Sequence, residues 1–193
     1  MQNRQIASRS IGIFGVSLAY AVIRYNLFGN VSLEQLPSYI LNKALAFSAA
    51  ATLAVSAAGY ARRNQLMLQS WAKVSLGFAM AHILLSVGLW SRDYFPKLFG
   101  PHRMNLAGEL TLLFGVLAAW LYGFLGFFSR KPFFAGRWLA ALMLGLHAMA
   151  LGFPGWLKPG EWPGGLPPIS LLCFLLALAA AILFVQRRKD ASH

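Results

Sequence analysis

Cysteine is almost absent from this chain, and so are the sequence patterns that hold nucleotides. The single cysteine, Cys173, excludes an internal disulfide and a metal site made of several thiolates. Because Cys173 lies inside an apolar run, we expect it to be a small packing residue. There is also no internal repeat and no glycine-rich phosphate loop of the G-x-G-x-x-G type. We therefore expect no nucleotide-binding domain.

Charged residues are scarce as well, at 11% of the 193 residues, whereas 58% are hydrophobic. This composition does not suit a water-soluble domain. A helix needs about 20 apolar residues to cross a membrane, and lipid leaves backbone polar groups no partner outside a helix or a closed barrel. We therefore predict an all-α membrane protein, a single six-helix transmembrane domain covering residues 1–193. Its expected helices are 9–28, 38–60, 71–91, 105–128, 138–156 and 166–186.

The net charge of +12 follows the expected membrane topology, so it does not indicate nucleic-acid binding. If successive helices alternate in direction, 11 of the 17 basic residues fall on the side that carries both termini. Cytoplasmic loops are enriched in Lys and Arg. We therefore expect both termini in the cytoplasm and a multi-pass protein of the bacterial inner membrane, surrounded by lipid.

Two histidines lie at matching positions inside the expected helices 71–91 and 138–156, which run in the same direction. His82 follows Lys73 by nine residues, and His147 follows Arg137 by ten. At about 1.5 Å of rise per residue, the two histidines lie within roughly 2 Å of the same depth. Polar side chains this deep in a membrane are usually functional.

Two neutral imidazoles facing each other suit the two axial positions of a haem iron that only passes electrons. The other nitrogen of each ring then needs an acceptor, and we expect the carbonyl one turn earlier, at Phe78 or Met143. The alternative is that each histidine only hydrogen-bonds a neighbouring helix, which stabilises the packing by about 1 kcal/mol.

Residues 60–155 resemble the ferric-reductase-like transmembrane domain family, which includes the membrane haem subunit of a periplasmic methionine sulfoxide reductase system and six-helix metalloreductases. The resemblance rests on Arg62 and Arg63 followed by "KVSLGFAMAHILLSVGL", then on "NLAGELTLLFGVLAAWL" and "GRWLAALMLGLHAMAL". It implies one b-type haem between His82 and His147. Family members with two haems carry a further histidine on each helix, where this chain has Gln69, Phe95, Phe134 and Gly160.

The resemblance also implies an electron-transfer subunit without substrate chemistry of its own. A quinol, and hence a quinone site, or a cytosolic flavoprotein would supply electrons. A periplasmic oxidoreductase or a ferric chelate would accept them. The flavin and nicotinamide domain of the larger reductases is not in this sequence.

Charged residues in the outer third of three expected helices form a second group: Arg24, Lys43 and Glu109. Buried charges need partners, so Glu109 is expected either to pair with Arg24 or Lys43 or to take a proton from a quinol. Alternatively, the basic members of this group bind haem propionates, and Asn26 and Asn42 are expected to share either network. His102, in the loop after helix 71–91, is a candidate metal or partner contact on the outer face, or is simply solvated.

Two further functions stay open at this point. A haem-free structural or assembly subunit would use the same histidines to hold its helices together. A small transporter is a weaker alternative, since no pair of expected helices shows the broken, repeat-related pattern of a substrate site.

Overall fold

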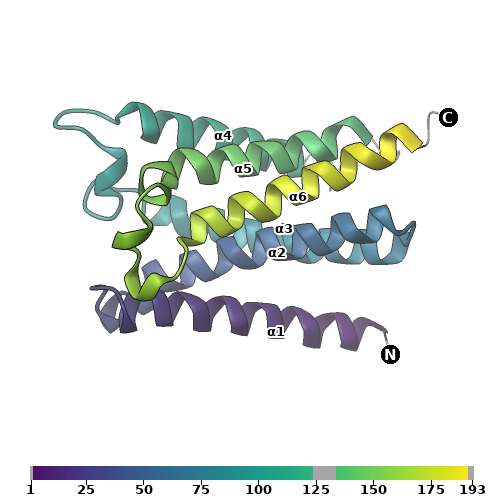
Figure 1. Ribbon diagram of the computed structural model, residues 1–193, viewed down its shortest axis with the longest axis horizontal. Coiled ribbons are helices and arrows are strands. Elements are labelled where there is room, and N and C mark those ends of the chain that lie inside the picture. Colours follow the sequence, from purple (N-terminus) through teal and green to yellow (C-terminus); the bar gives the residue numbers. More distant parts are fainter. Residues whose placement is uncertain (1, 124–133, 191–193) are drawn as a thin grey trace.

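The computed structural model describes residues 2–123 and 134–190, and within them six long helices. These are α1 (Gln2–Val22), α2 (Leu41–Ala61), α3 (Gln65–Gly88), α4 (Leu106–Gly123), α5 (Phe134–Trp156) and α6 (Ile169–Asp190) (Figure 1). Each of the six belongs to a segment long and apolar enough to cross a membrane. The predicted all-α, six-helix architecture is therefore confirmed.

Several helices extend beyond the predicted apolar runs. α1 begins at Gln2 instead of residue 9, and a wide helical turn, η1 (Ile23–Leu27), continues it. α3 begins six residues earlier than predicted, where the side chain of Asn64 caps the helix by accepting a hydrogen bond from Met67 N at 2.9 Å. An apolar run measures only the part of a helix that lies in hydrocarbon. Outside it, water and capping side chains satisfy the backbone, so the helix can continue into polar sequence.

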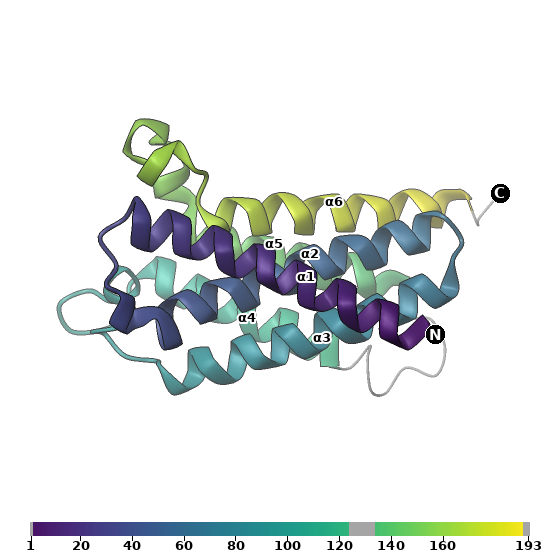
Figure 2. The ribbon, with the colours of Figure 1, turned by 90° about the horizontal axis from the view of Figure 1, so that it is seen from below.

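Neighbouring helices pack in the order α3, α2, α6, α5, α4, with α1 lying against α2 on the outside. The ring of helices is not closed, because α3 and α4 make only sparse contacts with each other. Both chain ends lie at the same end of the bundle, on the right in Figures 1 and 2. The six helices therefore alternate in direction, as the sequence predicts.

Small residues form the contacts between α2, α5 and α6. Ala57, Ala141 and Ala180 are fully buried there, in one cluster with Leu53, Tyr60, Leu68, Ala181 and Phe184. Lipid is as apolar as leucine, so helices gain little by burying large apolar side chains and instead approach closely where residues are small.

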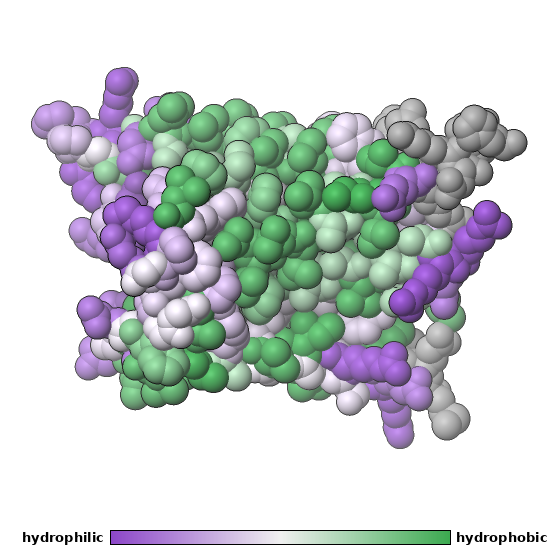
Figure 3. All heavy atoms as spheres, in the orientation of Figure 1, coloured by the Kyte–Doolittle hydropathy of each residue, from purple (hydrophilic) through white to green (hydrophobic). Residues whose placement is uncertain are grey.

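The outer surface is the reverse of that of a soluble protein. Large apolar side chains are exposed along the helices, for example Leu84, 69% exposed on α3, and Trp120, 62% exposed on α4. In Figure 3 hydrophobic residues form a belt around the middle of the visible face, and hydrophilic residues gather at its two ends. This distribution suits a multi-pass membrane protein.

Candidate functional site

The structure brings the two helix-borne histidines together. The imidazoles of His82 on α3 and His147 on α5 have their ring centroids 6.5 Å apart, with the ring planes at 75° to each other. The two rings lie between two pairs of helices. One pair is α2 with α3, and the other pair is α4 with α5. The equal depth predicted from the sequence is thus realised as a direct juxtaposition of the two rings.

Each ring is held by one nitrogen. His147 Nδ1 lies 2.8 Å from the carbonyl oxygen of Thr111 on α4. His82 Nδ1 lies 2.6 Å from Asn42 Oδ1 and 3.2 Å from the Asn42 carbonyl oxygen, both on α2. A carbonyl oxygen can only accept, so Nδ1 carries the proton in both neutral rings. Both Nε2 atoms therefore keep a lone pair, and neither has a hydrogen-bond partner among the described residues.

The prediction that these nitrogens bond to the carbonyls of Phe78 or Met143 is wrong. A carbonyl one turn earlier in the same helix already accepts the backbone hydrogen bond of that helix. Instead, each ring bonds to a neighbouring helix. His82 bonds to α2, and His147 bonds to α4. The contacts between helices, which the sequence does not fix, decide which acceptor each ring finds.

Asn42 is the residue that orients His82, a role the sequence reasoning missed. Its side chain is buried, and Ser86 Oγ lies 3.0 Å from Asn42 Nδ2 and 3.1 Å from Asn42 Oδ1. Ser86 therefore steadies the amide that holds the imidazole. In the sequence, the feature that could have indicated this role is an asparagine inside an apolar run, next to Lys43.

Gly115 on α4 is the second residue of the site that was not predicted from the sequence. A Cβ atom added at this position would lie 2.9 Å from His147 Nδ1 and 3.2 Å from Cε1, closer than side chains normally approach. The missing side chain therefore makes room for the His147 ring. A glycine in the interior of a helix often marks such a close approach, and Gly115 is one turn from Thr111.

The separation of the rings suits a metal bound between them. A metal–imidazole bond is about 2.0 Å, which with the radius of each ring places the centroids of two opposed ligands about 6 Å apart. Two imidazoles alone do not complete a coordination shell, and the described part of the chain has no group of three or more His, Cys, Asp or Glu that could hold an ion. This donor set fits a metal whose remaining ligands come from a macrocycle such as haem.

The two cations predicted for the outer third each lie over one ring of a tyrosine pair. The guanidinium of Arg24 lies 5.3 Å from the ring centroid of Tyr25, and Lys43 Nζ lies 5.2 Å from that of Tyr39. These two tyrosines make an edge-to-face contact at 5.4 Å.

Arg24 is only 5% exposed, and its Nε and one terminal nitrogen have no hydrogen-bond partner. The pair expected between Glu109 and Arg24 or Lys43 is not formed, because Glu109 is exposed on α4 and joins neither cation. Among the side chains that the structure describes, those of residues 4–123 and 136–186, the one ion pair is the exposed Lys158–Glu161 contact. A buried cation without a carboxylate, here Arg24, leaves room for an anionic group supplied from outside the chain.

The other candidate residues lie apart from this site. His102 is exposed in the loop between α3 and α4. Cys173 is buried on α6 and packs in a cluster with Ala148 and Ile169.

No protein-family model matches the sequence, and no curated protein matches it either.

Proposed function

We propose that this protein is a membrane-embedded b-type cytochrome in which His82 and His147 hold one haem through their Nε2 atoms. The observation that carries the proposal is the pair of neighbouring imidazoles, 6.5 Å apart, each with Nδ1 committed to a carbonyl acceptor and Nε2 without a partner among the described residues. Metal-binding histidines use this arrangement, in which a second acceptor fixes the tautomer and the direction of the ring. A haem bound there would supply a one-electron carrier.

The residues around the two histidines would do the remaining work of binding. Asn42 and Thr111 orient the two ligands, and Gly115 leaves space for the His147 ring. Lys43 and Arg24 are the proposed partners of the two propionates, since they are cations without a carboxylate of their own. If they hold propionates, Lys43→Gln lowers haem retention while the protein yield stays constant. A lower yield with normal haem content per protein contradicts this role.

The membership of the ferric-reductase-like family is part of the same proposal, with both termini cytoplasmic in a bacterial inner membrane. The basic residues Arg4, Arg9, Arg62 and Arg63 lie at the end of the bundle that carries the termini, which supports this orientation. Because both axial positions would be filled, the protein needs partners at its two faces. A quinol, with Glu109 as the proton acceptor, or a flavoprotein would donate electrons. A periplasmic oxidoreductase or a ferric chelate would accept them.

The test is the visible spectrum of the purified protein, reduced minus oxidised. We expect a sharp reduced α band that carbon monoxide does not change, with one haem per chain. His82→Ala and His147→Ala should each abolish the band or open the iron to carbon monoxide. His102→Ala, which removes an exposed histidine, is the control and should leave the spectrum intact. The cytochrome proposal fails if haem-replete protein shows no band, or if the band survives both variants unchanged.

A haem-free structural or assembly subunit is the second candidate. The observation in its favour is that each histidine joins two neighbouring helices, α2 to α3 and α4 to α5. In that case the double variant His82→Ala/His147→Ala should lower thermal stability, and wild-type protein should have no visible band. If the protein is a cytochrome, wild-type protein should show the visible band, and the double variant should lose the band while it is still folded.

A further inference from the structure

A groove of about 220 Å³ lies between α1, α2 and α3, at the end of the bundle that carries both termini in Figures 1 and 2. Three of the described residues that line it are polar: Gln5, Arg9 and Asn64. The others are apolar or aromatic: Ile6, Val55, Leu66, Met67 and Trp71. The histidine site shares none of these residues, so the groove is independent of the proposed haem.

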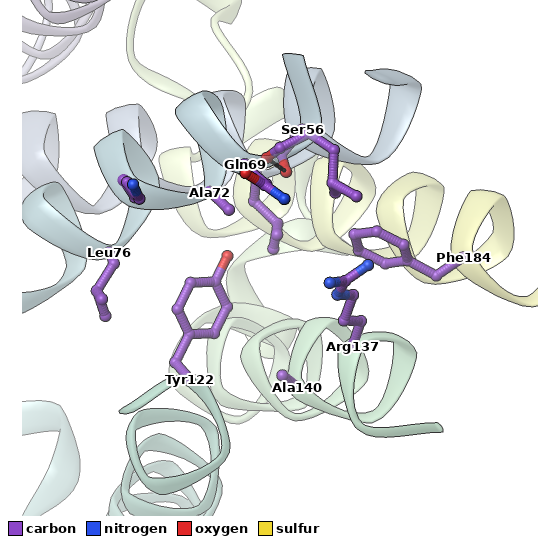
Figure 4. A pocket seen from close by; sticks show the side chains of 11 residues that line it. Ser56, Gln69, Ala72, Leu76, Tyr122, Arg137, Ala140 and Phe184 are labelled. Carbon is purple, nitrogen blue, oxygen red and sulfur yellow. Dashed lines mark hydrogen bonds between the residues drawn. The ribbon is translucent and has the colours of Figure 1, made fainter. Parts of the chain in front are cut away.

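A second, larger cavity near the same end is lined by other residues of α3, among them Gln69, Ala72 and Leu76 (Figure 4). The two spaces share no described residue, and of the two only the groove is bordered by described residues of α1. Most contacts of α1 with the other long helices are with α2, and those with α3 are few. A molecule that fills the groove would therefore add to the contacts that hold α1 against the bundle.

The N-terminus of α3 forms part of the groove. This helix has 24 residues and begins at Gln65, and Asn64 caps it through Oδ1, which accepts from Met67 N at 2.9 Å. The Asn64 carbonyl accepts from Leu68 N at 3.0 Å. The backbone N–H groups of Gln65 and Leu66 have no acceptor within the helix, and Asn64 Nδ2 remains as a donor. The N-terminus of a long helix attracts anions through such N–H groups and through its partial positive charge.

Two side chains of the groove add further donors. Trp71 on α3 is only 6% exposed, and no hydrogen bond joins its indole N–H to another described residue. A buried tryptophan N–H usually has a partner. On the opposite wall, α1 contributes Arg9, the one charged side chain among the described residues that line the groove. A cation, an indole N–H and a helix N-terminus thus border one space, which is suited to an anion.

The rest of the groove is apolar. Ile6 and Val55 are half-buried in its walls, and Leu66 at its edge is 51% exposed. Trp71 follows Asn64 by seven residues, which is about 10 Å along α3, so the groove extends from the polar turn into the apolar part of the helix. A free phosphate would occupy only the polar part. A phosphate with an attached acyl chain matches both parts.

We propose that this groove binds an anionic phospholipid, with its phosphate at the N-terminus of α3 and beside Arg9. One acyl chain would lie along Ile6, Val55 and Leu66. Helix N-termini bind phosphate groups, and basic pockets between transmembrane helices bind anionic headgroups. The bound lipid would connect α1 with α3, which contact each other little in the protein alone.

The experiment compares thermal unfolding in nanodiscs of pure phosphatidylcholine with nanodiscs that also contain phosphatidylglycerol. We expect phosphatidylglycerol to raise the Tm of the wild-type protein by several degrees and to remain bound after detergent extraction, as counted by native mass spectrometry. Arg9→Gln should lose at least half of the Tm gain and most of the retained lipid. Arg9 is exposed, so this variant tests the groove without disturbing the core.

Arg4→Gln is the matched control, since it removes one exposed positive charge from the same helix but outside the groove. Equal losses in Arg9→Gln and Arg4→Gln would overturn the proposal, because attraction to the membrane surface would then be diffuse. Ile6→Trp fills the apolar part of the groove and keeps every charge. It should also lower the amount of retained phosphatidylglycerol, and normal retention in this variant would contradict the placement of the acyl chain.

Inorganic phosphate added to phosphatidylcholine nanodiscs distinguishes the two sources of a phosphate group. We expect it to give less protection than phosphatidylglycerol. If millimolar phosphate stabilises the protein as much, the groove takes a free anion and the lipid assignment is wrong. Retained lipid and the Tm gain are measured without reference to haem, so this test and the cytochrome test can fail separately.

Discussion

The bundle has two sides that are built differently. On the closed side, where α2, α6 and α5 meet, fully buried alanines such as Ala57, Ala141 and Ala180 let the helices touch. On the open side, between α3 and α4, the helices make few contacts. Two members of the histidine site lie on the helices that border the open side: His82 on α3, and Thr111, the acceptor of His147, on α4. Close packing of small residues thus holds α2, α5 and α6 together, whereas α3 and α4 are joined mainly through the other helices.

This difference follows from the solvent. In a membrane no hydrophobic effect drives helices together, so contact depends on shape and on hydrogen bonds. Along the closed side, the small side chains of the alanines let the helices approach each other closely. Imidazole and amide groups need hydrogen-bond partners inside the bundle, and those of His82, Asn42 and His147 find them across α2–α3 and α4–α5.

The largest expected effect comes from filling the closed side. Ala180→Leu inserts three carbon atoms at a position with no exposed surface, and such overpacking costs about 1 to 3 kcal/mol. Ala19→Leu makes the same change on an exposed face of α1 and should cost almost nothing. Thermal unfolding in detergent measures both. Equal Tm values for the two variants would mean that the closed side is not close-packed.

A smaller change at the open side should remove function without removing the fold. Gly115→Ala places a methyl group 2.9 Å from His147 Nδ1, so the ring must turn away from its acceptor and from His82. We expect haem affinity to fall by more than tenfold, since the supporting residues of a metal ligand typically contribute 10- to 100-fold. Haem content per protein and the Tm of the protein are the two measurements.

Gly77→Ala is the control for Gly115→Ala. It adds the same methyl group to α3, at a position where no atom lies within 4 Å. It should leave haem content unchanged and strengthen the helix slightly. If both variants bind haem like the wild-type protein, the close approach of α4 to His147 has no functional role.

The sequence predicts those parts of the structure that depend on one helix at a time. Six apolar runs give six helices, and counting residues from Lys73 and Arg137 places His82 and His147 at one depth, because helix rise per residue is constant. The acceptors Asn42 and Thr111, the space at Gly115 and the lack of a Glu109 pair depend on how helices are rotated against each other. That rotation depends on many small contacts between apolar residues of similar size, which the periodicity of a single helix does not specify.

The smallest expected effect concerns the hydrogen bond to His82. Asn42→Ala removes the acceptor at 2.6 Å but leaves the backbone carbonyl of the same residue at 3.2 Å. We expect about tenfold weaker haem binding, and a higher reduction potential, because an imidazole with a weaker acceptor is a poorer electron donor to the iron. Ser86→Ala, which only releases the amide from Ser86 Oγ, should shift both quantities less. Redox titration followed at the α band measures the reduction potential of each variant. If the shift in Ser86→Ala equals or exceeds the shift in Asn42→Ala, then Asn42 does not orient His82 directly.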